Sequence, residues 1–141
     1  MTAILQEMTA DQGRIQEYFH FLHQNPGVAF EEKVAASFIA KKLREWGYEV
    51  TEGIGKTGVV GQLKVGDGEA RIGLRADTDA LPVQEGSDLP YKSQIDGKSH
   101  MCGHDAHSAM LLGAAEHLAR TRNFSGTLNV IFQPAEEIMG G

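Results

Sequence analysis

The sequence predicts one α/β domain in which helices flank a β-sheet. Apolar residues recur at helical spacing in three segments. Shorter apolar runs, typical of strands, lie between the second and third of these segments and after the third. The 141 residues, 41% hydrophobic and 23% charged, are enough for one domain with its own core and too few for two.

Three amphipathic segments predict helices. The first starts at a capping box formed by Thr9 and Gln12 and ends at Asn25-Pro26-Gly27. It carries His20 and His23, which we interpret as partly exposed or core-edge residues. The second helix follows Glu31 and stops at a glycine, and the third follows a histidine-rich segment. The buried stripe of the third helix is expected to contain Met110, Leu111, Ala114 and Leu118.

Strand character appears after the second helix. Four strands are expected, at residues 48–51, 59–65, 71–75 and 127–132. The turn Gly66-Asp67-Gly68-Glu69 is expected to join the second and third of them as a hairpin. Residues 81–98 contain several prolines and glycines and are expected to form a loop.

The glycine-rich segment 53–58 matches the letters of a dinucleotide-binding motif, but its context differs. That motif must open a helix, whereas a predicted strand follows here. A phosphate-binding loop ending in Gly55-Lys56-Thr57 would need a glycine where Val50 stands. We therefore interpret these glycines as tight turns.

Charge and composition exclude several classes of protein. The formal charge is −6, from 13 basic and 19 acidic residues, and no basic cluster is present, so nucleic-acid or anionic-membrane binding is not expected. No apolar run approaches the roughly 18 residues of a membrane span, and no secretory signal is visible. The single cysteine fits a reducing compartment, and we expect a cytoplasmic protein.

The segment 100–107 contains the only cysteine and three of the six histidines. Cys102 and His104 are two residues apart, so in an extended segment their side chains point the same way. A thiolate and an imidazole so placed suit Zn²⁺ or another late first-row metal, and a following helix N-terminus would favour the thiolate. The alternative is that Cys102 is a small buried apolar residue. His100 and His107 receive no role.

Two further groups of acidic residues follow predicted strands. Glu136 and Glu137 lie just past the last strand, where one could bind a metal while the other takes a proton from metal-bound water. A solvated surface pair is the alternative. Asp77 and Asp79 follow the third strand, and they could form a turn or orient a histidine by hydrogen bonding.

The chain resembles the amidohydrolase branch of the M20 metallopeptidase family. The matching stretches are residues 73–85, 100–106 and 131–137, together with 23–26 and 30–32. Their order and spacing agree over nearly the whole chain. The resemblance implies a zinc-exopeptidase-like mixed β-sheet flanked by helices.

The resemblance also implies roles for individual residues. Cys102, His104 and Glu137 would be metal ligands, Glu136 the general base, and Asp79 the acidic residue that supports the site. One or two divalent ions would bind, zinc or manganese, with nickel or cobalt also possible. Asp77 stands where the wider superfamily has a histidine, so no ligand role is carried over to it.

The implied function is hydrolysis of the amide bond of a small N-acyl amino acid. Family members are more than twice as long, so residues 1–141 are expected to be the N-terminal part of the catalytic domain. The lid and dimerisation domain and the C-terminal remainder would then be absent, and the fragment inactive alone. At full length a homodimer is expected. The alternative is a non-catalytic metal-binding or thiol redox domain centred on Cys102.

Overall fold

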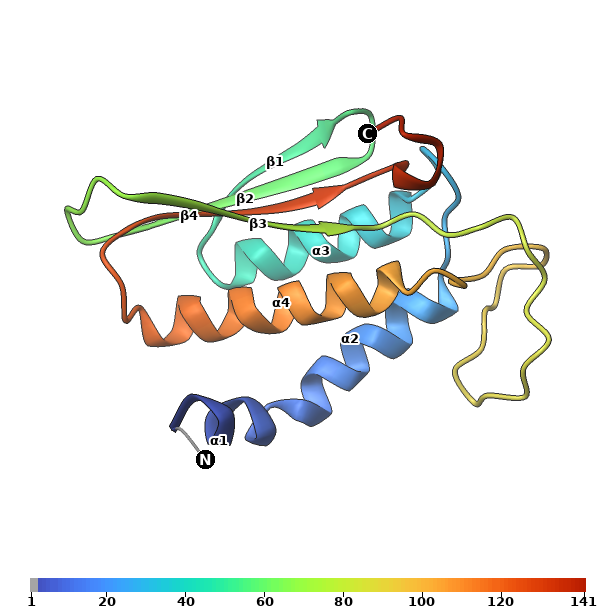
Figure 1. The fold of residues 1–141 in the computed structure, drawn as a ribbon, viewed down its shortest axis with the longest axis horizontal. Coiled ribbons are helices and arrows are strands. Elements are labelled where there is room, and N and C mark those ends of the chain that lie inside the picture. The colour runs from blue at the N-terminus through green and yellow to red at the C-terminus, as the bar shows by residue number, and fades with distance from the viewer. Residues whose placement is uncertain (1–2) are drawn as a thin grey trace.

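A computed structural model describes residues 3–141, in which helices cover one face of a four-stranded sheet (Figure 1). Helices α3 and α4 lie against the sheet, and α2 packs against α4. The elements are α1 (Ala3–Ala10), α2 (Gln12–Gln24), α3 (Lys33–Glu45), β1 (Glu49–Ile54), β2 (Gly58–Val65), β3 (Arg71–Asp77), α4 (His104–Thr121), β4 (Gly126–Gln133) and the 3₁₀ turn η1 (Glu136–Ile138). This confirms the predicted α/β class with a mixed sheet flanked by helices.

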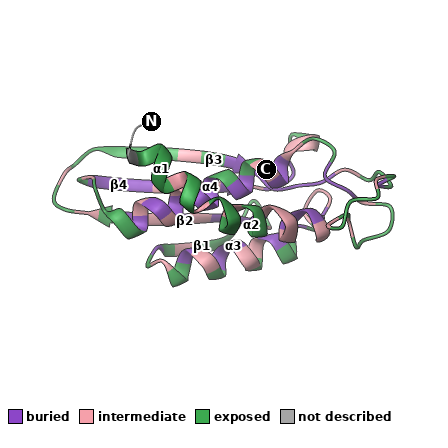
Figure 2. Ribbon diagram, turned by 90° about the horizontal axis from the view of Figure 1, so that it is seen from below, coloured by how far each residue is buried: buried purple, intermediate pink, exposed green. Residues whose placement is uncertain are grey.

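The strand order β1-β2-β4-β3 contradicts the predicted β2–β3 hairpin. Strand β4 lies between them, antiparallel to β2 and parallel to β3, and Leu128 is aligned with both Leu63 and Ile72. The physical reason is burial. β4 is the most buried strand (Figure 2), and the central position covers both of its edges. The connection from β2 to β3 therefore crosses over β4. At the start of β4, the backbone N–H of Gly68 donates a hydrogen bond to the Ser125 hydroxyl.

The first helix also differs from its prediction. The Thr9 hydroxyl donates to the Leu5 carbonyl inside α1, so Thr9 does not cap α2. The chain instead turns at Asp11, whose carboxylate pairs with Arg14 and Arg120. Serine and threonine hydroxyls can hydrogen-bond to nearby backbone groups in more than one way. Here the bond to the preceding turn of α1 forms in place of a cap on α2.

The buried face of α4 is wider than predicted and excludes Met110, which is 59% exposed. Because α4 lies between the sheet and α2, two of its sides are covered. Its buried apolar residues are Ala109, Leu111, Leu112, Ala115 and Ala119. Ala114 and Leu118 are half-buried.

The glycine-rich segment forms the β1–β2 hairpin, as the tight-turn interpretation requires. Gly53, Gly55 and Lys56 have φ of 80°, 56° and 81°, the left-handed region that favours glycine.

No helix within residues 3–141 is long and apolar enough to span a bilayer.

Candidate metal centre

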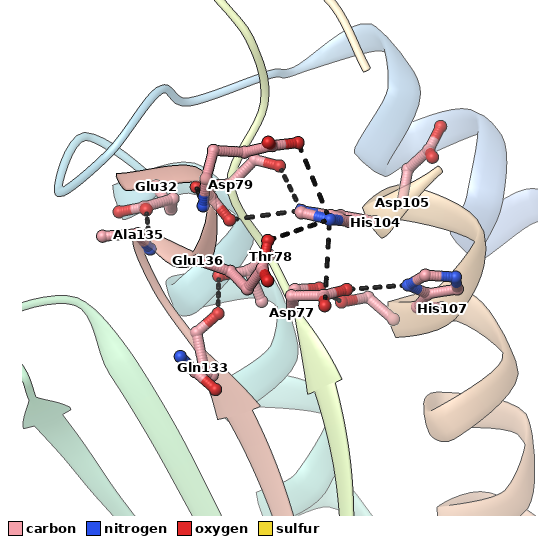
Figure 3. Close-up of polar contacts among 12 residues, drawn as sticks. Glu32, Asp77, Thr78, Asp79, His104, Asp105, His107, Gln133, Ala135 and Glu136 are labelled. Carbon is pink, nitrogen blue, oxygen red and sulfur yellow. Dashed lines mark hydrogen bonds and ion pairs between the residues drawn. The ribbon is translucent and has the colours of Figure 1, made fainter. Parts of the chain in front are cut away.

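The candidate site lies where β3, β4 and α4 meet. Strands β3 and β4 are parallel with Asp77 opposite Gln133, so their carboxyl ends lie side by side. The Thr78 N–H and hydroxyl both donate to the Gln133 carbonyl, which joins the two segments that leave the sheet. Helix α4 begins next to them at His104 (Figure 3). Acidic residues from two strand ends therefore surround the first residue of a helix.

His104 is the centre of this arrangement and is 2% exposed. Its Nδ1 lies 3.0 Å from the Asp79 carbonyl oxygen and 3.2 Å from Asp79 Oδ1. Both of these atoms accept hydrogen bonds, so Nδ1 carries the proton and donates. In the neutral ring the lone pair would then lie on Nε2, and this is the form that binds a metal.

Carboxylates lie around His104 Nε2. The nearest oxygens of Asp77, Glu136 and Glu137 are 3.8, 3.7 and 3.8 Å away. Figure 3 shows Asp77 and Asp79 on either side of the ring. Several anionic oxygens gathered around one ring nitrogen favour a cation at that position.

The ligand atoms of Cys102, His104 and Glu137 all lie within 4.8 Å of one another. Glu137 Oε1 is buried and has no hydrogen-bond partner among the described residues. A buried acceptor without a donor costs about 1–3 kcal/mol, and a bound cation would satisfy it. Thiolate, imidazole and carboxylate are also the donor types that Zn²⁺ prefers. The residues present therefore fit a divalent metal ion.

Cys102 is neither a small buried apolar residue nor a thiolate favoured by the helix N-terminus. It is exposed, so it is not a small buried apolar residue. Its pKa is raised, chiefly by the neighbouring Glu137 carboxylate, then by partial desolvation of the sulfur and by the charges of Glu136 and Asp77. The helix N-terminus is thus outweighed by carboxylates, and the thiol form is favoured until a cation offsets them.

A second group, formed by Asp77, His104 and His107, also lies within 4.8 Å. Its atoms already bond to one another. His107 Nδ1 is 2.7 Å from Asp77 Oδ1, and Arg75 donates to Asp77 Oδ2 at 3.0 Å. Burial would raise the pKa of Asp77, but the hydrogen bond from His107 and the charges of His104 and Arg75 bring it below its ordinary value. Both groups include His104, so they compete, and of the two only the cysteine group contains a buried ligand atom, Glu137 Oε1, without a hydrogen-bond partner among the described residues.

Asp79 and Glu32 are buried carboxylates that support the candidate metal centre without belonging to either ligand group. Asp79 is 1% exposed, and its Oδ2 accepts the Glu137 N–H at 2.9 Å while Oδ1 faces His104. Glu32, also 1% exposed, accepts the Ala135 N–H at 2.9 Å and the Thr57 hydroxyl at 2.6 Å. Asp79 thus orients two candidate ligands, and Glu32 fixes the left-handed Ala135 just before the glutamate pair. Nothing in the sequence pattern distinguished Glu32 from its exposed neighbour Glu31.

Glu136 and His100 occupy the margins of the centre. The Glu136 side chain is 40% exposed on the open side, which leaves its carboxylate free to contact a water beside His104 Nε2. His100 is buried, belongs to neither ligand group, and has no hydrogen-bond partner for Nδ1 among the described residues. Burial lowers the pKa of His100 to about 4.

Carboxylates that follow two neighbouring strands, together with a thiol and an imidazole at the start of a helix, are an arrangement typical of a metal-dependent hydrolase. The fold matches that of a dinuclear metal binding peptidase from the M20 family of Bacillus subtilis, with a TM-score of 0.86 and 39% identity over 92% of this chain and 37% of that chain. Residues 73–141 match the model of Peptidase family M20/M25/M40. The chain belongs to this family, which confirms the resemblance seen in the sequence.

Two curated relatives come from its amidohydrolase branch. The hippurate hydrolase of Campylobacter jejuni is 52% identical over 138 residues, which are 98% of this chain and 36% of the relative. The N-acetylcysteine deacetylase of Bacillus subtilis is 42% identical over 122 residues, or 85% of this chain and 32% of the relative. The chain thus spans about a third of the length of the relatives it matches.

Proposed function

We propose that residues 1–141 form the N-terminal part of the catalytic domain of a metal-dependent hydrolase that cleaves N-acyl amino acids into a carboxylic acid and a free amino acid. The main support is the convergence of Cys102, His104 and the unpaired Glu137 Oε1, with Glu136 on the open side. The names of the two curated relatives, a hippurate hydrolase and an N-acetylcysteine deacetylase, support an N-acyl amino acid as the substrate class.

Each side chain has a task in this proposal. Cys102, His104 Nε2 and Glu137 would hold a divalent ion, and Asp79 keeps His104 and Glu137 in place by its two hydrogen bonds. The ion would polarise the amide carbonyl and lower the pKa of a bound water. Glu136 accepts the proton of the attacking water and delivers it to the leaving amine.

The metal and the assembly are also proposals. Three protein ligands complete one catalytic zinc-type site, and the thiolate favours zinc over manganese, nickel or cobalt. The name of the Bacillus subtilis structure, a dinuclear metal binding peptidase, supports a second ion, whose further ligands would come from outside these residues. We also propose a cytoplasmic homodimer at full length, with a separate lid and dimerisation domain, and little turnover by residues 1–141 alone.

The decisive experiment compares a chain extended to the length of its relatives with its Glu136→Gln variant. N-acetyl, N-benzoyl and indole-acetyl amino acids are the substrates, each assayed with zinc, manganese, cobalt and nickel. A rise in kcat with one metal, lost by about 10²-fold or more in the variant at equal metal content, supports the proposal. No hydrolysis of any conjugate, or a variant with the kcat of the parent, contradicts it.

A thiol redox domain is the competing function, and the pKa of Cys102 opposes it. Redox cysteines depend on a lowered pKa, whereas the pKa of Cys102 is raised, chiefly by Glu137. Cys102→Ala separates the two functions. The hydrolase proposal requires metal content and amidase activity to fall together.

A further inference from the structure

A second buried cluster of charged side chains lies behind the metal centre. His23, at the end of α2, is 7% exposed and lies between Asp105 and Glu85, which are 3% and 8% exposed. Its Nδ1 is 2.6 Å from Asp105 Oδ2, and its Nε2 is 3.3 Å from Glu85 Oε1. These contacts join positions 82 and 62 residues apart in the sequence. His23 is therefore not the core-edge residue that helical periodicity indicated.

Each nitrogen of the His23 ring faces a carboxylate. A carboxylate only accepts hydrogen bonds, so both nitrogens must donate to satisfy it, and the ring is an imidazolium between two anions. Removing one member leaves the others buried without their partner. His23 is thus a two-sided donor that joins Asp105 to Glu85.

The Glu85 end of this contact holds the loop formed by residues 82–98. Glu85 also accepts the hydroxyl proton of Ser87 and the N–H of Ser93, at 2.7 Å for the latter. The Tyr91 ring stacks on His20, with centroids 3.9 Å apart, and covers the His23 ring edge-on. The loop is therefore attached to α2 through one buried carboxylate under an aromatic cover.

The Asp105 end holds the start of α4, next to His104. Asp105 Oδ1 accepts the Ala106 N–H at 2.9 Å, which uses the other oxygen of the same carboxylate. Between the loop and α4 the chain runs through Cys102 and the left-handed Gly103 without helix or strand. The position of Cys102 therefore depends on how the two ends of this short segment are held.

We infer that His23 is a positioning residue of the proposed metal centre, which it serves by tying the loop through Glu85 and helix α4 through Asp105, and so fixing the segment that carries Cys102 and His104. The inference rests on the proposed function for the presence of the metal. His23 itself touches neither the ligand atoms nor the solvent-exposed side of the site, where Glu136 lies.

The test measures zinc affinity by competition with a chromophoric chelator in a chain extended to the length of its relatives. His23→Gln keeps a single donor group and should weaken zinc binding by about 10- to 100-fold, as loss of a residue that supports a ligand does. His117→Gln is the matched control. His117 is 7% exposed, as is His23, but it lies 13 residues after His104 on α4, about 20 Å away. Its zinc affinity should stay within about twofold of the parent.

A double-mutant cycle and a second readout separate positioning from general loss of stability. Asp105→Asn should cost little further affinity in the His23→Gln background, because both residues act through the same contact. Zinc should protect Cys102 from alkylation at low concentration in the parent and at a higher concentration in His23→Gln. Excess zinc should restore the kcat of His23→Gln.

Parent zinc affinity in a folded His23→Gln variant, or an equal loss in His117→Gln, would overturn the inference. A parent that binds no zinc overturns both the inference and the metal centre. A parent that binds zinc but hydrolyses no conjugate contradicts only the proposed function, because affinity and alkylation are measured without turnover.

Discussion

The carboxylate of Asp79 lies 3.2 Å from Nδ1 of His104, and the carbonyl of the same residue lies 3.0 Å from that nitrogen. One buried residue thus sets both the tautomer and the orientation of the imidazole. The other carboxylate oxygen of Asp79 accepts the Glu137 N–H. Two of the three candidate ligands therefore depend on a side chain that is not itself in the ligand group.

Replacing Asp79 should weaken metal binding without removing a ligand. Asp79→Asn presents an amide N–H to one of its two partners in place of a charged acceptor, so we expect about a 10- to 100-fold loss of zinc affinity. Chelator competition measures it. Asp88→Asn, at an exposed position of the loop, is the control and should bind zinc as the parent does. Equal affinities for the two variants would contradict the role assigned to Asp79.

Removing the charge of Glu137 should have opposite effects with and without metal. In the metal-free protein the unpaired Oε1 is unfavourable, so Glu137→Gln should unfold at the same temperature as the parent or a higher one. Zinc should then raise the unfolding temperature of the parent by several degrees and that of the variant by much less. Calorimetry with and without zinc measures both. A metal-free variant clearly less stable than the parent would show that Oε1 already has a partner.

Glu32 should be important for stability as well as for the site. Glu32→Ala leaves the Ala135 N–H and the Thr57 hydroxyl without their acceptor, which we expect to cost about 2–4 kcal/mol of unfolding free energy. Glu31→Ala removes only an exposed ion pair with Lys98 and should cost about 1 kcal/mol or less. Denaturant unfolding of the two variants provides the comparison. Similar losses in both would mean that burial of Glu32 is not what matters.

The contribution of His23 to stability should depend on pH in a defined direction. Burial would lower the pKa of His23, but its hydrogen bonds with Asp105 and Glu85 outweigh burial, and the net pKa is raised. Protonated His23 therefore stabilises the fold fully at pH values below its unfolded-state pKa of about 6.5. This contribution is lost as the pH rises through its folded-state pKa. The difference in unfolding free energy between the parent and His23→Gln should therefore be largest at about pH 6 and shrink at higher pH.

Glu85 should show the opposite sign. Burial would raise the pKa of Glu85, yet hydrogen bonds from Ser87, Ser93 and His23 lower it to about 2. Its contribution is present above the unfolded pKa of about 4.5 and is lost as pH falls toward about 2. Urea unfolding of Glu85→Gln and the parent from pH 3 to 8 should show a difference that grows between pH 3 and 5. A constant difference across that range would contradict the assigned pKa.

Local structure was largely predictable, because it depends on residues close in sequence. Helical periodicity located α3 and α4, short apolar runs located the strands, and the glycines marked the β1–β2 turn. The capping box at Thr9 failed, since its hydroxyl bonds backward to Leu5 instead. The resemblance to a family also points to Cys102, His104 and Glu137, and the ligand atoms of these three residues lie within 4.8 Å of one another.

The sequence by itself thus determined the class of fold, most of its helices and strands, and the residues proposed to hold a metal. Only the tertiary structure decided the placement of β4 between β2 and β3, the competition of two groups for His104, and the contact that joins His23 to Asp105 and Glu85. Each of these depends on burial and hydrogen bonding between residues distant in the chain, such as His23 and Asp105, which are 82 positions apart. Periodicity and spacing describe neighbours along the chain, whereas desolvation of a charge depends on what packs around it in space.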